Sequence, residues 1–196
     1  SAAGLYAWLG SYGQPDVPLA QRLAEGEDLR ASRPSQAEAE AQAAPFLPPP
    51  DEPPAEYAEL IERLREVVPT RPDDKEGWRL LARNEAGLGN YAAAARAAEH
   101  LVGLVGQEVS AEDLTLLLDL HVAAAGGLVT AQAEDEANWL LRKNPDDRAG
   151  RYYLGLLEMQ VDRPDNAFAL WRPLAESGVD DRFTALARAQ IGDAAR

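Results

Sequence analysis

The sequence predicts an all-α protein, and three observations support this prediction. Alanine is abundant, Val and Ile are sparse, and only 7% of the 196 residues are aromatic, a composition that favours helices over strands. From residue 56 onward, apolar residues recur at the three- and four-residue spacing of one helix face. A Pro-Asp-Asp signature occurs at Pro72 and again at Pro145, and each time it supplies an aspartate able to cap the helix that follows.

Charge and composition exclude several classes of function. The chain has 33 acidic and 19 basic residues, a net charge of −14, so it is a poor ligand for nucleic acid or anionic lipid, which bind clustered Lys and Arg. It has no cysteine and only two histidines, His100 and His121. Thiol nucleophiles and thiolate-bound metals are therefore excluded, and no histidine pair has the spacing of a zinc-binding helix. We expect no enzymatic activity, no cofactor and no metal.

Residues 1–33 are predicted to form a membrane-proximal N-terminal segment. Its first ten residues form a short, uncharged and mainly apolar stretch. Tyr6 and Trp8 in that stretch, and Tyr12 just after it, suit the interfacial end of a membrane helix. A short arm that docks on the domain explains the same residues, and the two interpretations stay open. The sequence contains no run of 18 apolar residues that could span a bilayer.

Residues 34–54 are predicted to be a Pro-rich linker. Seven of these 21 residues are proline, and residues 46–50 should be extended and polyproline-like. The segment has too few apolar residues to fold alone. We therefore expect a flexible tether that ends where a helical domain, residues 55–196, begins.

The helical domain has an internal period. Pro72 and Pro145 are 73 residues apart, which is two units of about 34 residues plus five, and 34 residues is the length of a tetratricopeptide (TPR) helix pair. Counted from Lys75, the first unit matches the TPR pattern at Trp78, Leu81, Ala82, Gly89, Tyr91 and Ala94. Counted from Arg148, the third matches at Leu154, Gly155, Ala167 and Trp171, with Pro164 opening its second helix.

The unit between these two, residues 114–147, is a degenerate repeat. His121 occupies a position that normally takes a small residue, and Thr130 is a plausible N-cap for the second helix. Flanking helices are expected over residues 56–68 and 180–191. The sequence thus predicts a TPR-type α-solenoid of about three helix pairs, preceded by the linker and the N-terminal segment.

The TPR register predicts a peptide-binding groove. In such arrays the first helix of each pair lines the concave face, and the positions that point into the groove are here cationic in the first repeat and apolar in the next two. That set suits an amphipathic peptide helix with a carboxylate at one end. Alternatively, the two arginines pair with acidic neighbours such as Glu76. The predicted groove residues are Arg79, Arg83, Leu118, Val122, Tyr152, Leu156 and Met159.

Other conspicuous residues are interpreted as structural. Trp78, Trp139 and Trp171 fall at or beside core positions of the repeats, and His121 is expected to be packed at a repeat interface. The acidic run at residues 134–136 is expected to be a solvated helix start. The aspartates after Pro72 and Pro145 are caps rather than metal ligands.

Three segments of the repeats and one N-terminal stretch resemble a known family. Residues 76–83 (EGWRLLAR), 124–130 (AAGGLVT) and 151–156 (RYYLGL), with the stretch from Leu9 to Arg22, are similar to the periplasmic TPR region of the cytochrome c maturation subunit CcmI, also called CycH. The resemblance covers nearly the whole chain except the Pro-rich linker. The stretch after Leu9 resembles the part of that family which follows its second membrane helix.

The resemblance implies a function, a location and partners. Such proteins capture apocytochrome c by its C-terminal helix and deliver it for haem ligation in the periplasm, and are anchored to the inner membrane by a segment that would lie upstream of Ser1. The implied partners also include the haem ligase CcmF, the thiol-handling CcmH and the haem chaperone CcmE. A chain without cysteine fits a holding role because it forms no mixed disulfides. The alternative function is a TPR adaptor that scaffolds other envelope or cytosolic proteins.

Overall fold

The structure, a computed structural model, describes residues 19–194. The predicted membrane-helix end or docked arm lies outside the described residues. All regular structure in the described part is helical, with no strand. The α-helices are α2 (Leu19–Ala31), α3 (Gln36–Ala43), α4 (Ala55–Val67), α5 (Lys75–Gly87), α6 (Tyr91–Val105), α7 (Ala111–Ala124), α8 (Ala131–Lys143), α9 (Arg148–Gln160), α10 (Pro164–Glu176) and α11 (Arg182–Ala194), joined in part by the short 3₁₀ helices η1 (Ala44–Phe46), η2 (Val68–Thr70) and η3 (Gly106–Glu108).

The described chain divides into two compact units. We call residues 34–151 the central unit, and residues 19–33 together with 152–194 the terminal unit. The division falls inside α9, and each unit is described by itself. Among the helices of the described residues, none is both long and apolar enough to cross a membrane.

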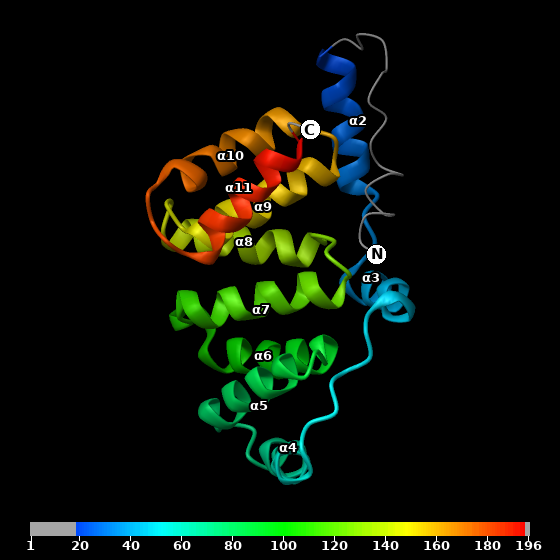
Figure 1. The fold of residues 1–196 in the computed structure, drawn as a ribbon, viewed down its shortest axis with the longest axis vertical. Helices are drawn as coiled ribbons and strands as arrows, with labels where there is room; N and C mark the ends of the chain where they lie inside the picture. The colour runs from blue at the N-terminus through cyan, green and yellow to red at the C-terminus, as the bar shows by residue number, and fades with distance from the viewer. Residues whose placement is uncertain (1–18, 195–196) are drawn as a thin grey trace. The chain divides into compact units, whose positions relative to one another are not determined.

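The central unit is a stack of consecutive helices. Each of α4, α5, α6 and α7 packs against the next helix along the chain (Figure 1). Small side chains on α6, such as Ala94, Ala97 and Ala98, are fully buried and allow its neighbours to approach closely. Large apolar side chains fill the rest of the core, namely Ile61, Leu81, Leu101, Leu114, Leu118 and Leu140. The predicted fold class, an all-α TPR-like solenoid, is confirmed.

The helix starts of the central unit confirm the predicted caps. The Asp74 carboxylate accepts a hydrogen bond from the backbone N–H of Gly77 at 3.0 Å, and Asp147 accepts one from Gly150 at 2.8 Å. The Thr130 hydroxyl accepts the N–H of Ala133 at 3.2 Å at the start of α8. Each cap satisfies a donor that the first helical turn leaves unpaired. The Pro-Asp-Asp signature thus sets where α5 and α9 begin.

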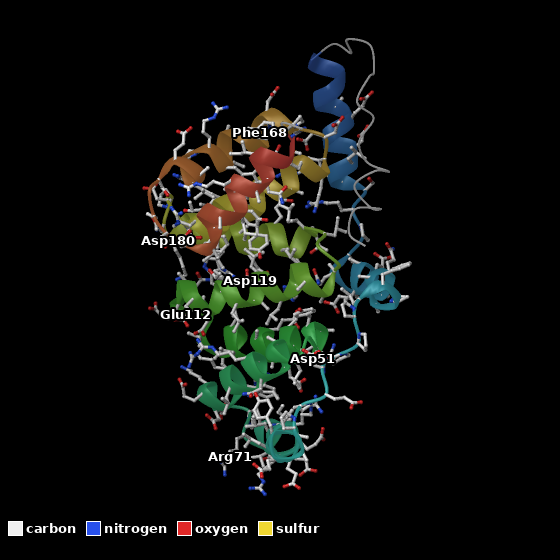
Figure 2. The ribbon with its side chains drawn as sticks, in the orientation of Figure 1. Asp51, Arg71, Glu112, Asp119, Phe168 and Asp180 are labelled. Carbon is white, nitrogen blue, oxygen red and sulfur yellow. The ribbon has the colours of Figure 1, made fainter. Side chains whose placement is uncertain are left out.

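Within the segment predicted to be a Pro-rich linker, residues 34–54, the structure contains a helix that was not expected from the sequence. Residues 36–43 form α3, which packs on α7 and α8 in the central unit and buries Ala39. The helix forms because Ser35 and Glu38 make a capping box, and because the segment between the prolines is rich in the helix formers Ala, Glu and Gln. Residues 47–54 have no regular structure, and the N–H of Asp51 donates to the carbonyl of Leu88 at 2.7 Å (Figure 2).

The terminal unit is built around one tryptophan. Trp171 of α10 is fully buried, and its indole N–H donates to the carbonyl of Tyr152 in α9 at 3.0 Å. The ring of Phe183 from α11 lies 5.8 Å from that of Tyr152. Gly155 leaves room for the indole, because a Cβ there would lie 2.3 Å from its nitrogen. As predicted from the sequence, Pro164 opens α10, where its missing N–H costs nothing.

Candidate functional site

The cationic end of the predicted groove lies in the central unit, and Arg79 is fully engaged there. Its guanidinium bonds the carboxylate of Asp113 at the start of α7 in bidentate fashion, with both N···O distances 2.8 Å, and it also pairs with Glu76. Asp113 is only 5% exposed. These hydrogen bonds hold the pKa of the Asp113 carboxyl below its ordinary value and raise that of the arginine. Arg79 therefore connects α5 to α7.

Arg83, one helical turn further along α5, has a weaker attachment. It pairs with Glu112, the residue next to Asp113, and both side chains are at least half exposed (Figure 2). An exposed ion pair of this kind stabilises a fold by less than about 1 kcal/mol. Both arginines thus have the acidic partners that the alternative interpretation expected, but only the Arg83 pair lies in water where a ligand carboxylate could replace Glu112.

This difference between the arginines gives a stability prediction. We expect Arg79→Ala to lower the free energy of unfolding of the central unit by about 2–3 kcal/mol, because it leaves the buried Asp113 carboxylate without its partner. Arg83→Ala should cost less than about 1 kcal/mol. Urea unfolding followed by circular dichroism measures both. Equal losses for the two variants would contradict the structural role assigned to Arg79.

The apolar part of the predicted groove is mostly closed. Leu118 and Val122 of α7 are buried in the central unit, and Tyr152 and Leu156 of α9 are buried in the terminal unit. Only Met159 keeps partial exposure. The sequence register placed these residues on the concave face, but their side chains serve as core. Four of the five apolar side chains predicted to line the groove are therefore buried in this structure, and the binding role of the groove stays a proposal.

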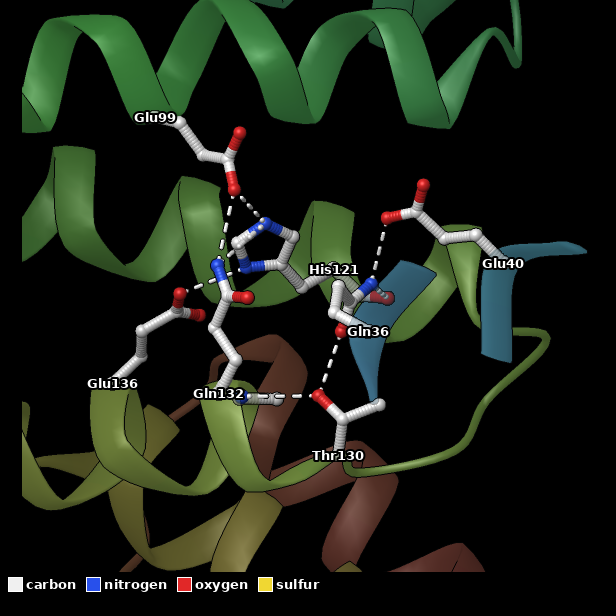
Figure 3. A network of polar contacts seen from close by, with 8 residues as sticks. Gln36, Glu40, Glu99, His121, Thr130, Gln132 and Glu136 are labelled. Atoms are coloured by element: carbon white, nitrogen blue, oxygen red, sulfur yellow. Dashed lines mark hydrogen bonds and ion pairs between the residues drawn. The ribbon is translucent and has the colours of Figure 1, made fainter. Parts of the chain in front are cut away.

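A buried polar network that the sequence did not predict lies in the central unit (Figure 3). His121 of α7 is 1% exposed; its Nδ1 lies 2.8 Å from Oε1 of Glu136 in α8, and its Nε2 lies 3.1 Å from Oε1 of Glu99 in α6. Gln132 donates to the same oxygen of Glu99 at 3.0 Å. Both ring nitrogens are thus occupied within the fold. The expectation of a packed histidine at a repeat interface is confirmed.

The network continues into α3, in the segment predicted to be linker. The side-chain amide of Gln36 donates to the carbonyl of His121 at 3.0 Å, and the hydroxyl of Thr130 donates to Oε1 of Gln36 at 2.7 Å (Figure 3). The same amide nitrogen donates to Glu40 at 2.8 Å. Because Gln36 is buried, its side chain supplies hydrogen bonds to His121 and Thr130 at the turn between α7 and α8. The capping-box pattern Ser-x-x-Glu at residues 35–38 was the available sequence signal for this helix.

The charges of the network favour a protonated His121. Burial alone lowers the pKa of the imidazole, but the carboxylates of Glu136 and Glu99 outweigh it and raise that pKa above 6.5. Burial also raises the pKa of Glu136, whose Oε2 has no hydrogen-bond partner. Among the described residues, no group of three or more His, Asp or Glu side chains has the arrangement of a metal site. The network joins α6, α7 and α8 through hydrogen bonds between ionisable side chains.

A pocket of about 380 Å³ lies between α4, α5 and α6. Its walls include Trp78 and His100, whose rings lie 4.0 Å apart, with Arg65 and Arg96 nearby. Trp78 is only partly buried and donates its indole N–H to the carbonyl of Pro72 at 2.9 Å. The prediction that the three helix tryptophans are core residues holds for Trp171 but not for Trp78 or Trp139, which are both partly exposed.

Comparison with known proteins identifies relatives. The chain is 31% identical over 174 residues, 88% of its length, to the cytochrome c-type biogenesis protein CycH of Bradyrhizobium diazoefficiens. The chain is homologous to CycH. It is also 30% identical over 178 residues, 90% of its length, to the CycH protein of Rhizobium meliloti. The resemblance stated from the sequence is thereby confirmed, although no protein-family model matches the chain.

The chain spans only part of each CycH relative. It covers 40% of the Bradyrhizobium protein and 39% of the Rhizobium protein. The alignment nevertheless takes in about nine-tenths of this chain, more than the TPR-like repeats alone. The similarity therefore applies to this helical region, whereas the activities and partners of the whole protein are matters for proposal.

Proposed function

We propose that the chain acts in cytochrome c-type biogenesis, in the periplasm, as a non-catalytic chaperone module that captures apocytochrome c. The observation that carries this proposal is the 30–31% identity to two cytochrome c-type biogenesis proteins over about nine-tenths of the chain. The helical stack supports it, because TPR-like arrays offer extended surfaces to peptide helices. The cysteine-free sequence also suits a protein that holds a thiol-bearing client.

In this proposal the ligand is the amphipathic C-terminal helix of the apocytochrome. A folded cytochrome packs the apolar face of such a helix against its own core, so that face is accessible only before haem attachment. By resemblance, the captured chain passes to CcmF, CcmH and CcmE, and an anchor in the inner membrane holds the module near them. The TPR adaptor remains the second candidate, since a helical stack binds many kinds of peptide.

The experiment that tests the proposal compares the two forms of the ligand. The apocytochrome should bind at least about tenfold more tightly than the holocytochrome, a difference of about 1.4 kcal/mol, in a calorimetric titration. A peptide of the C-terminal helix should compete with the apocytochrome. Equal affinity for both cytochrome forms would contradict the chaperone function and favour the TPR adaptor.

A second measurement tests the role of Arg83. Because its partner Glu112 is exposed, a ligand carboxylate can replace that partner, and Arg83→Ala should weaken apocytochrome binding several-fold with no loss of helical content. Glu112→Gln is the matched control and should strengthen binding or leave it unchanged. A ligand whose carboxylate is amidated should bind both variants with similar affinity. Unchanged binding by Arg83→Ala would show that this arginine is a solvated surface residue only.

A further inference from the structure

The pocket between α4, α5 and α6, which we call the Trp78 pocket, combines apolar and cationic walls. Its volume of about 380 Å³ falls within the range of about 300–1,000 Å³ that is usual for small-ligand sites. The buried side chains of Leu81 and Ala97 give it an apolar interior. The other residues of its walls are Arg65, Trp78, Glu85, Asn90, Ala93, Arg96 and His100.

Two aromatic rings of the pocket are held in fixed positions. The rings of Trp78 and His100 lie 4.0 Å apart, with an angle of 33° between their planes. The carbonyl of Pro72 lies 2.9 Å from the indole nitrogen of Trp78 and 2.9 Å from Nε2 of His100. Since a carbonyl only accepts hydrogen bonds, both nitrogens carry a hydrogen. Because the fold already orders both rings, a flat group that stacks on them binds with little further loss of side-chain entropy.

The acidic side chain of the pocket is already paired. Among the described residues that line the pocket, Glu85 is the one carboxylate, and it is 2% exposed. Arg65 bonds it at 2.6 and 2.9 Å, and the amide of Asn90 donates to it at 2.8 Å. These hydrogen bonds hold the pKa of the Glu85 carboxyl below its ordinary value in spite of burial. Glu85 is therefore ionised, and its charge is offset by Arg65.

Arg96 gives the pocket a positive charge that the fold leaves uncompensated. It is exposed on α6, and within residues 19–194 its guanidinium has no hydrogen bond or ion pair. Its charge nevertheless acts on Glu85, which places the guanidinium on the pocket side of α6. Since Arg65 and Glu85 offset each other, one positive charge remains in the pocket of a chain whose net charge is −14. The complementary ligand is an anion, and a guanidinium pairs best with the two oxygens of a carboxylate.

We propose that the Trp78 pocket binds a carboxylate that is joined to an aromatic ring by a short aliphatic chain. The carboxylate pairs with Arg96, and the ring stacks on Trp78 and His100 beside the apolar interior. This combination of groups occurs in free aryl carboxylic acids and at the C-terminus of a peptide that ends in an aromatic residue. Both sources present the same chemistry to the pocket.

The Trp78 pocket is separate from the predicted groove. Trp78, Leu81 and Glu85 recur at helical spacing and share one face of α5. Arg79 and Arg83 lie one turn apart on a different face and bond to acidic residues of α7. The proposal therefore does not depend on the capture of apocytochrome.

The experiment titrates phenylpropionate into the full chain and follows the indole N–H signals by NMR. The chain has four tryptophans, and Trp78→Phe and Trp139→Phe assign two of the four signals. The amide of phenylpropionate removes the charge of the ligand, and propionate removes its ring. Arg96→Gln removes the cation of the pocket. The matched control is Arg142→Gln, which changes another exposed arginine, one helical turn from the partly exposed Trp139.

Phenylpropionate is expected to shift the Trp78 signal saturably and to leave the Trp139 signal in place. The amide, propionate and the Arg96→Gln change should each weaken binding at least tenfold, whereas Arg142→Gln should leave it unchanged. Circular dichroism checks that each variant folds. No saturable shift of the Trp78 signal, equal binding of the amide or of propionate, or an equal loss in Arg142→Gln would overturn the proposal.

A peptide arm distinguishes the two sources of the carboxylate. A short peptide that ends in phenylalanine carries the same ring and carboxylate as phenylpropionate, and its amidated form lacks the charge. Tighter binding of the free-acid peptide than of phenylpropionate, lost on amidation and in Arg96→Gln, would support the C-terminus of a partner chain as the ligand. Binding of phenylpropionate without measurable binding of the peptide would support a free aryl carboxylic acid.

Discussion

Replacing Trp171 with alanine is expected to lower the free energy of unfolding of the terminal unit by about 3–5 kcal/mol. The indole is fully buried, donates a hydrogen bond to the carbonyl of Tyr152, and lies 6.2 Å from the ring of Tyr152 in α9 and 6.4 Å from that of Phe168 in α10. The change removes the largest side chain of this core and leaves a cavity that the α9 and α10 backbones cannot fill. Amide hydrogen exchange in α9 and α10 measures the loss locally.

Two further variants check that packing is the cause. Trp139→Ala removes a partly exposed tryptophan and should cost clearly less than Trp171→Ala. Gly155→Ala forces a Cβ to within 2.3 Å of the Trp171 nitrogen and should itself cost about 1–3 kcal/mol. Combined with Trp171→Phe, the Gly155→Ala penalty should shrink, because the two changes act on the same contact. Additive losses would show that the contact is not responsible.

Replacing His121 with leucine is expected to lower the free energy of unfolding of the central unit by about 3–5 kcal/mol at neutral pH. The change leaves the buried Glu136 carboxylate, whose Oε2 is already unpaired, without its cationic partner. The double change His121→Leu/Glu136→Leu should recover most of the loss, because apolar side chains can replace a buried ion pair without loss of stability. A double variant no more stable than the single one would contradict this account.

The pH dependence of stability tests the charge of His121 directly. Its pKa is raised in the folded chain by Glu136 and Glu99, so the folded state holds the proton more tightly than the unfolded state does. The resulting stability is fully present below the ordinary histidine pKa of 6.5 and is lost as the pH rises through the higher folded value. The pKa of Glu136 is also raised in the folded chain, so this residue likewise makes stability fall as the pH rises above its ordinary pKa of 4.5. Urea unfolding of the wild type should therefore show falling stability above about pH 6.5, and His121→Leu should flatten the curve.

Local sequence signals predicted the helices and their starts well. The Pro-Asp-Asp caps at Asp74 and Asp147, the Thr130 cap and Pro164 at the start of α10 depend only on neighbouring residues, and each occurs where it was expected. By contrast, α3 was missed because proline content was averaged over residues 34–54, although the eight residues of the helix contain no proline.

The candidate site was harder to predict, because exposure depends on contacts between distant segments. The repeat register assigned Leu118 and Val122 to a concave surface, yet both are buried. Nothing in the sequence near Arg79 shows that Asp113, 34 residues away, holds it in a bidentate pair. The opposite holds on α4: the spacing of Tyr57, Leu60 and Val67 predicts a buried helix face, yet all three side chains are exposed.

Because α3 is attached to α7 and α8, a shorter part of residues 34–54 is free to extend. An unattached 21-residue polyproline-like segment could extend about 65 Å, whereas the eight residues 47–54 between η1 and α4 extend about 25 Å. Tension applied to the chain ahead of α3 would therefore reach the stack at the turn between α7 and α8, where Gln36 is bonded to His121 and Thr130. The α4 end of the stack would carry none of that load.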